Sequence, residues 1–392
     1  MSVEDRARIL RSLGAAGSLL PELLAYTENP YQGRRQDVEQ SLPLGVEAQL
    51  DAWRTYAEEA RSAGVVETLR RRLVQLRFPV EAGISQYGDY RAATRRGEIP
   101  PDNGLGLVFA DADGIQLTIE GSIAGPIPVL VTRAREDFVT LVRALAGRNE
   151  PIDVPPSMGA CLVKGLTNWH RVALHRERWQ QQRGEGNDSR DGEAAWSEEF
   201  QRLAAHKELY QDRLLLLSSG PYSNVPAQEL GLPADAWRVR SLRIRREHEA
   251  FHYLTLRLYG QIRSNLLDEL LADLAGLLAA DSAYSPELAL RFLGTDHNAQ
   301  IRTDARLRLY VGEPPLSTEA VAVLAHLAVR ASHNLARVAT DSGRDFGDPL
   351  ERTALLLALA DGALEELADE AAIRDRAQFA SELRVCLSEP RS

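Results

Sequence analysis

Apolar residues recur every three or four positions along much of the chain, which is the period of amphipathic helices. This pattern predicts helices over residues 3–26, 46–76, 198–212, 286–293, 318–340 and 350–387. The pattern changes between residues 100 and 150, where Leu107–Phe109 and Ile115–Ile119 flank the turn-forming residues Asp111–Gly114 and predict a hairpin. A further strand over residues 128–131 and a helix over 136–146 would complete a small α+β unit.

The polar, glycine-rich stretch at residues 184–194 has no apolar period and is typical of a surface loop or a domain boundary. We therefore predict a helical N-terminal region over residues 1–99 and a small α+β unit with a following helix over 100–183. A flexible loop at 184–195 and a last domain over 196–392 complete the division. Within that domain, the apolar run at residues 213–218 is typical of a buried strand or of a helix end. The predicted fold class is α+β, mostly helical.

The sequence His-Glu-Ala-Phe-His at residues 248–252 lies in a segment that we expect to be helical from Pro233 onward, with Asp235 as its cap. Residues four apart lie on one face of a helix, so His248 and His252 can bind one metal ion together. Glu249 then lies beside them, where its carboxylate can accept a proton from a metal-bound water. The spacing therefore predicts a hydrolytic metal site.

A hydrolytic zinc ion takes three protein ligands and keeps one position open, so a third ligand must come from elsewhere. Glu269 is the expected third ligand, because it begins a second pair of acids four residues apart, with Asp273. Asn265 is a suitable N-cap for the helix that carries this pair, and Asp268 is placed to cap it reciprocally. Asp273 could itself compete with Glu269 as the third ligand.

The two motifs together resemble the gluzincin class of zinc metallopeptidases, over about residues 235–280. The resemblance implies a zincin-like catalytic domain, in which the metal helix packs under a small sheet and an edge strand of that sheet pairs with an extended peptide substrate. It also implies that Asp273 supports a metal-binding histidine from behind. An oxyanion donor is required as well, and Tyr253, Tyr259, His297 and Tyr310 are the candidates.

Composition limits the partners. The formal net charge of −10 and the absence of a sustained basic block argue against nucleic acid as the main partner. No stretch has the length and purity of a membrane span, and the N-terminus lacks the apolar core of a signal peptide. The two cysteines, far apart in sequence, do not form a disulfide framework. We expect a cytoplasmic protein that acts on a peptide or protein substrate, while its oligomeric state stays open.

Three functions are compatible with this sequence. The first is a zinc-dependent peptidase or amidase, with Zn²⁺ held by His248, His252 and Glu269 and with Glu249 as general base. The second keeps the same ligands but binds Fe²⁺, because two histidines and one carboxylate also suit non-haem iron enzymes. The third is a degenerate peptidase that acts as a binding module. A helix whose two histidines are merely surface or core residues is the structural alternative to all three.

Overall fold

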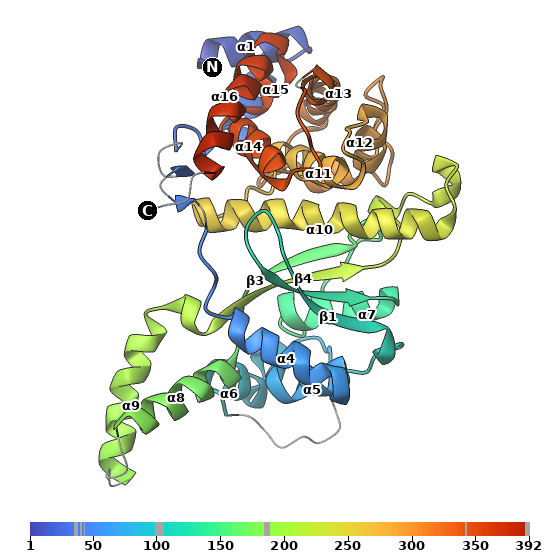
Figure 1. Cartoon of the computed structure of the whole chain (residues 1–392). Coiled ribbons are helices and arrows are strands. Elements are labelled where there is room, and N and C mark those ends of the chain that lie inside the picture. Colours follow the sequence, from blue (N-terminus) through green and yellow to red (C-terminus); the bar gives the residue numbers. More distant parts are fainter. Residues whose placement is uncertain are drawn as a thin grey trace. The chain divides into compact units, whose positions relative to one another are not determined.

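A computed structural model describes residues 1–34, 38, 39, 41, 42, 44–98, 106–183, 189–341 and 343–388 of the chain. The described protein is mostly helical and contains a four-stranded mixed sheet, which confirms the predicted α+β class (Figure 1). The chain divides into two compact units. Unit 1 comprises Met1–Leu44 and Pro221–Ser392, and unit 2 comprises Gly45–Gly220. The predicted boundaries at residues 99, 183 and 195 therefore fall inside unit 2 rather than between the two units.

Unit 1 is a group of packed helices. Its helices are α1 (Val3–Ser12), α2 (Leu19–Tyr26), α10 (Ala234–Tyr259), α11 (Leu266–Asp281), α12 (Pro286–Leu293), α13 (Thr318–Asp341), α14 (Pro349–Ala360), α15 (Leu364–Ala368) and α16 (Glu370–Ser388). The long helix α10 packs along α11, which in turn contacts α14, while α13 packs against α15 (Figure 1). The helix predicted over residues 286–293 is confirmed at both ends. The helices predicted over 3–26 and 350–387 are each broken into shorter ones.

A glycine brings α10 and α11 into close contact. A Cβ atom at Gly276 of α11 would lie 2.7 Å from the carbonyl oxygen of Ile244 on α10, so only glycine fits at this crossing. Ile244 lies one helical turn before His248, and Gly276 lies about one turn after Asp273. The contact therefore sets the spacing of the two helices next to the residues of both sequence motifs.

Unit 2 holds the sheet, which has the strand order β1-β2-β4-β3. Its elements are α4 (Leu50–Ala63), α5 (Val65–Arg72), α6 (Gly88–Arg96), β1 (Ile115–Glu120), β2 (Ile127–Thr132), α7 (Arg135–Leu141), the π-helical turn η4 (Val142–Ala146), β3 (Ala160–Thr167), α8 (Trp169–Arg183), α9 (Ser189–Ala204) and β4 (Gln211–Ser218). β2 and β4 are parallel, whereas β1 pairs with β2 and β3 pairs with β4 in antiparallel fashion. Trp53, Phe138 and Leu214 belong to the apolar core that α4 and α7 form with this sheet.

Three sequence predictions for unit 2 were wrong, and each has a physical reason. Leu107–Phe109 is not a strand, because the Asp137 carboxylate accepts hydrogen bonds from the next two main-chain N–H groups, those of Ala110 and Asp111, and ties the segment to α7. Residues 189–195 are helical rather than loop, since α9 packs back on α8 through Trp179 and Trp196. Residues 184–188 lie outside the described residues.

The third wrong prediction concerns the end of the helix expected over residues 198–212. That helix stops at Ala204, and β4 begins at Gln211. The apolar run 213–218 is thus a strand, as its composition indicated. It lies in the interior of the sheet between β2 and β3, so it offers no free edge to a substrate.

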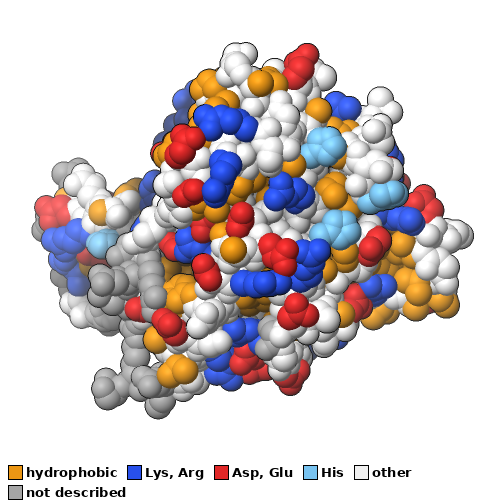
Figure 2. Space-filling model, turned by 90° about the horizontal axis from the view of Figure 1, so that it is seen from above, with side chains coloured by type: hydrophobic (Ala, Val, Ile, Leu, Met, Phe, Trp, Pro, Cys, Tyr) orange, Lys and Arg blue, Asp and Glu red, His pale blue; other side chains and the backbone are white. Residues whose placement is uncertain are grey.

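The outer surface carries charges of both signs. On the face seen in Figure 2, basic and acidic side chains are interspersed and form no continuous basic area. None of the helices in the described part of the chain has the length and apolar character needed to cross a membrane.

Candidate metal centre

The two histidines of the first motif lie on one uninterrupted helix. No glycine or proline occurs between Ala234 and Tyr259, and α10 ends where Gly260 adopts a left-handed conformation (φ 73°). Pro233 precedes the helix as expected, but Asp235 does not cap it through its side chain. His248 and His252 therefore lie one turn apart near the middle of unit 1, and both are buried.

The second motif begins helix α11. The Asn265 side chain caps this helix by accepting a hydrogen bond from the N–H of Asp268, as predicted. Asp268 does not cap the helix in return, because its carboxylate binds the main-chain N–H and the guanidinium of Arg263 in a buried ion pair. Glu269 and Asp273 follow in the first two turns and face α10.

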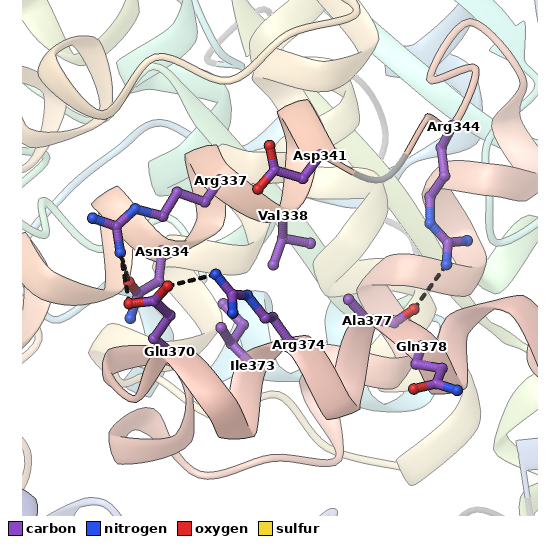
Figure 3. A pocket seen from close by; sticks show the side chains of 10 residues that line it. All are labelled: Asn334, Arg337, Val338, Asp341, Arg344, Glu370, Ile373, Arg374, Ala377 and Gln378. Carbon is purple, nitrogen blue, oxygen red and sulfur yellow. Dashed lines mark hydrogen bonds and ion pairs between the residues drawn. The ribbon is translucent and has the colours of Figure 1, made fainter.

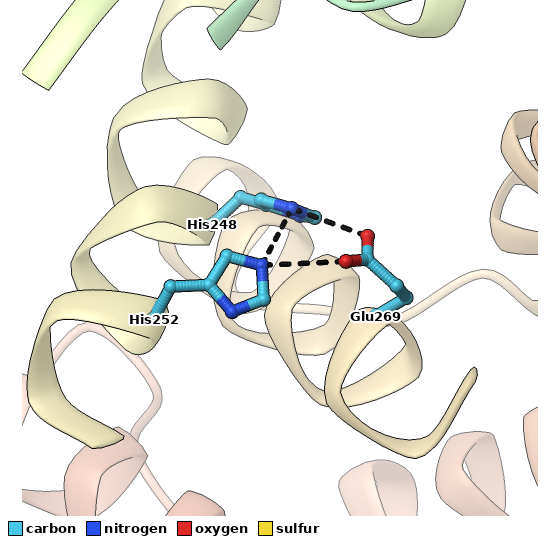
Figure 4. A group of neighbouring side chains, drawn as sticks. All are labelled: His248, His252 and Glu269. Atoms are coloured by element: carbon cyan, nitrogen blue, oxygen red, sulfur yellow. Dashed lines mark hydrogen bonds and ion pairs between the residues drawn. The ribbon is translucent and has the colours of Figure 1, made fainter. Parts of the chain in front are cut away.

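Three potential ligand atoms converge between α10 and α11 (Figure 4). The Nε2 atoms of His248 and His252 lie 3.2 Å apart. Each also lies 3.5 Å from one carboxylate oxygen of Glu269, His248 from Oε2 and His252 from Oε1. Within the described ranges this is the one group of three such side chains close enough to share an ion.

These distances fit a tetrahedral metal ion. Ligand atoms about 2.0 to 2.2 Å from a tetrahedral zinc ion lie about 3.3 to 3.6 Å from one another. The observed spacings of 3.2 and 3.5 Å are close to that range. In addition, Oε2 of Glu269 is buried and accepts no hydrogen bond from the described residues. Because buried polar atoms normally have a partner, a bound cation would supply the partner that this oxygen lacks.

A network behind His248 determines which of its nitrogens faces the site. Nδ1 of His248 lies 3.0 Å from Oδ1 of Asp273 and 2.9 Å from the hydroxyl of Tyr222. The Tyr222 hydroxyl donates its single proton to Asp273 over 2.6 Å, so Nδ1 must be the donor toward both groups. Nδ1 thus carries the proton, and the lone pair of Nε2 is free to bind a metal ion.

Arg306 completes the network. Its guanidinium forms a buried ion pair with Asp273 and donates a hydrogen bond of 3.3 Å to the Tyr222 hydroxyl. Both carboxylate oxygens of Asp273 are therefore occupied by protein groups, which leaves Glu269 as the carboxylate available for a metal ion. The Asp273 side chain is fully buried, whereas those of His248 and Glu269 retain 8% and 9% exposure, so the supporting residue lies deeper than the ligands.

Charge coupling sets the protonation of the site. Burial lowers the pKa of His252, but the adjacent Glu269 carboxylate has the larger combined effect and raises this pKa to about 9, with a further contribution from Glu249. Burial raises the pKa of Glu269, yet the two histidines and Arg306 bring it down to about 2. Without a metal ion, Glu269 is thus an anion next to a protonated His252, and a bound cation would replace that proton.

Glu249 adds negative charge near this group. It is 8% exposed, next in sequence to His248, and its negative charge helps to raise the pKa of His252. Among the candidate oxyanion donors, Tyr310 lies next to Glu269. Burial and the Glu269 carboxylate together raise the pKa of Tyr310 well above its ordinary value. Tyr259 instead stacks on Tyr31.

The two remaining candidate donors have other surroundings. Arg257 lies over the ring of Tyr253 at 5.6 Å, and His297 lines a separate cavity with His333.

The structure thus brings together His248, His252, Glu269 and Asp273, as the sequence motifs predicted. Sequence reasoning missed Tyr222 and Arg306. Tyr222 lies in the short helical turn η6 (Tyr222–Asn224), and Arg306 begins η8 (Arg306–Leu309). Tyr222 is 26 residues from His248 and Arg306 is 33 residues from Asp273, and neither belongs to a local motif. Only the folded chain connects them to the histidines.

The geometry defines a buried group of two histidines and one carboxylate that can hold a metal ion between two packed helices. The chain belongs to a family of unknown function, DUF7005, which matches residues 8–371. No curated protein and no solved structure matches the chain.

Proposed function

We propose that this protein is a zinc-dependent metallohydrolase that cleaves a peptide or amide bond, as the gluzincin-like motifs imply. The observation that carries the proposal is the proximity of His248 Nε2 and His252 Nε2, which lie 3.2 Å apart and each lie 3.5 Å from a different oxygen of the Glu269 carboxylate. A zinc ion held there would supply a Lewis acid for the scissile carbonyl and would favour ionisation of water near neutral pH.

The protein side chains have separate roles in this proposal. Glu249 accepts the proton of the attacking water and passes it to the leaving amine. Tyr310 is the best-placed donor toward the developing oxyanion, because it lies next to Glu269. Asp273 and Tyr222 hold the His248 ring in the tautomer that leaves Nε2 free, and Arg306 keeps the Asp273 carboxylate ionised.

Two histidines and one carboxylate suit Fe²⁺ as well as Zn²⁺, and zinc is preferred here because of the gluzincin-like motifs. Metal analysis of protein purified without added metal, together with a measurement of O₂ consumption, separates the two ions.

Glu249→Gln tests the proposal. Quenched fluorescent peptide libraries are incubated with the zinc-loaded protein, and initial cleavage rates are compared. We expect Glu249→Gln to retain one zinc ion per chain and to lose at least about a thousandfold in cleavage rate, because the general base is gone while the ligands remain.

Glu247→Gln is the matched control. Glu247 is also buried and lies on α10 next to His248, but its carboxylate pairs with Arg246. Its replacement should leave the cleavage rate within a few-fold of the unchanged protein. Absence of cleavage by the zinc-loaded wild-type protein, or equal rates for the two variants, would contradict the proposal. Metal binding without cleavage would instead favour a degenerate peptidase that acts as a binding module.

A further inference from the structure

Unit 2 contains a groove that the metal site does not use. This β3 groove has a volume of about 690 Å³ and is lined by every residue of β3 from Cys161 to Thr167. The opposite wall comes from η4 and from α6. Of the cavities with described linings, it has the largest volume.

The groove runs along the free edge of the sheet. β3 is the last strand in the order β1-β2-β4-β3. Successive side chains of a strand point to opposite faces of the sheet. A cavity that touches seven consecutive residues therefore cannot lie over one face alone, and it must follow the edge, where the main chain of both faces is accessible.

Unpaired main-chain groups line this edge. The N–H of Ser218 donates to the carbonyl of Gly159, which makes these two residues a hydrogen-bonded pair. Because antiparallel pairing alternates, Cys161 and Val163 direct their main-chain groups toward β4, whereas Leu162 directs its groups toward the free edge. The register of β3 with β4 shifts between Val163 and Leu166, so this alternation ends at Val163. No main-chain hydrogen bond joins Leu162 or Lys164 to another described segment outside the sheet.

Positive charge surrounds the same edge. Arg95, Arg148 and Lys164 line the groove from three different elements, and no acidic residue is among the described lining. None of the three forms an ion pair with a described residue, although Arg96 next to Arg95 pairs with Glu98. These three cations have no acidic partner among the described residues, so they complement an anionic ligand.

Another cavity lacks these properties. The pocket between α13 and α16 also contains three arginines, but Arg337 and Arg374 both pair with Glu370, and Arg344 donates to the carbonyl of Ala377 (Figure 3). These three arginines have partners within the protein, so the pocket provides no comparable attraction for an anion.

We propose that the β3 groove binds an extended acidic peptide segment, which adds to the sheet as a strand beside β3. The peptide main chain pairs with the outward main-chain groups of Leu162, and its carboxylates face Arg95, Arg148 and Lys164. This inference does not depend on the metal centre, since all of the residues that carry it lie in unit 2.

The test uses the full chain and a fluorescent six-residue peptide of alternating Glu and Thr, with blocked ends. Binding is followed by fluorescence anisotropy at constant ionic strength, with and without a metal chelator. We expect the double variant Arg148→Ser/Lys164→Ser to bind this peptide at least tenfold more weakly. Lys207→Ser is the control, because Lys207 is exposed, lies in unit 2 outside the groove, and is the only other lysine of the chain.

Lysine acylation provides an independent readout. The chain contains two lysines, so the rates of acylation at Lys164 and Lys207 can be measured by mass spectrometry in one sample. Saturating acidic peptide should slow acylation of Lys164 at least fivefold and leave Lys207 unchanged. Equal protection of both lysines, or of neither, would contradict the proposal.

Peptide chemistry distinguishes strand pairing from simple charge attraction. A peptide with the same sequence but alternate N-methylated amides keeps its carboxylates and loses main-chain donors, and we expect it to bind at least tenfold more weakly. The corresponding Lys/Thr peptide should not bind. Equal binding of the methylated peptide, or full displacement of the acidic peptide by inorganic phosphate, would overturn strand pairing and assign the groove to small anions. A chelator should have no effect on any of these results, whereas it should abolish cleavage at the metal centre.

Discussion

The candidate metal centre of unit 1 and the β3 groove of unit 2 hold their charges in opposite ways. At the candidate metal centre the supporting charged side chains are buried and paired, as with Asp273 and Arg306, and hydrogen bonds from Tyr222 and Arg306 hold the Asp273 carboxylate. In the groove, Arg95, Arg148 and Lys164 are exposed and have no acidic partner among the described residues. The buried network can hold the metal-ligand atoms in place before an ion binds. The exposed cations of the groove can instead attract an anionic ligand, whose carboxylates then become their partners.

The largest expected difference between the two regions is in stability. Arg306→Met would leave the Asp273 carboxylate buried without its ion-pair partner, and we expect a loss of about 3–5 kcal/mol in the free energy of unfolding. Lys164→Met removes an exposed charge that has no acidic partner among the described residues, and it should change this free energy by less than about 0.5 kcal/mol. Urea unfolding followed by circular dichroism measures both. Similar effects of the two substitutions would show that the contrast in charge pairing has no energetic consequence.

A smaller effect, on zinc affinity, is expected when a group that orients His248 is removed. Tyr222→Phe removes the hydroxyl that lies between His248, Asp273 and Arg306, and it should weaken zinc binding by about 10–100-fold without preventing folding. Tyr90→Phe, which removes a buried hydroxyl in unit 2 that bonds to Asn149, is the control and should leave zinc affinity unchanged. Competition with a chromophoric chelator gives the affinities. An unaltered affinity in Tyr222→Phe would mean that this network does not orient the histidine.

The most gradual effect is the pH dependence of metal binding. Because the pKa of His252 in the metal-free site is raised to about 9, a metal ion must displace a proton at every pH below that value. Zinc affinity should therefore rise about tenfold per pH unit from pH 6 toward 9, with release of at least about one proton per ion. Calorimetry in buffers of different ionisation enthalpy measures the release. Binding without proton release at pH 7 would contradict the assignment, and peptide binding in the groove should show no such dependence.

The sequence predicted the grouping of the candidate metal ligands more completely than it predicted the sheet. The spacing of His248, His252, Glu269 and Asp273 is a local property of two helices, and each helix is specified by nearby residues such as the Asn265 cap and the Gly260 end. These local signals were sufficient to predict that the four side chains lie close together.

The remainder depends on contacts between distant segments. Tyr222 and Arg306 reach the site from turns that carry no motif, and β3 was not predicted at all, although it forms the edge on which the groove depends. The segment Leu107–Phe109 has the composition of a strand, but Asp137 holds the residues that follow it. The apolar period and the composition of the sequence each describe one segment at a time. They therefore did not reveal these contacts between distant segments.

Metal stoichiometry tests the central claim most directly. The purified chain is dialysed against Zn²⁺, and separately against Fe²⁺ without oxygen, and its metal content is measured beside that of a His248→Ala/His252→Ala variant with an unchanged circular dichroism spectrum. We predict one tightly bound zinc ion per chain and none in the variant. A wild-type chain that stays free of metal under saturation with both ions, or a variant that binds zinc equally well, would contradict the assignment of His248, His252 and Glu269 as a metal centre.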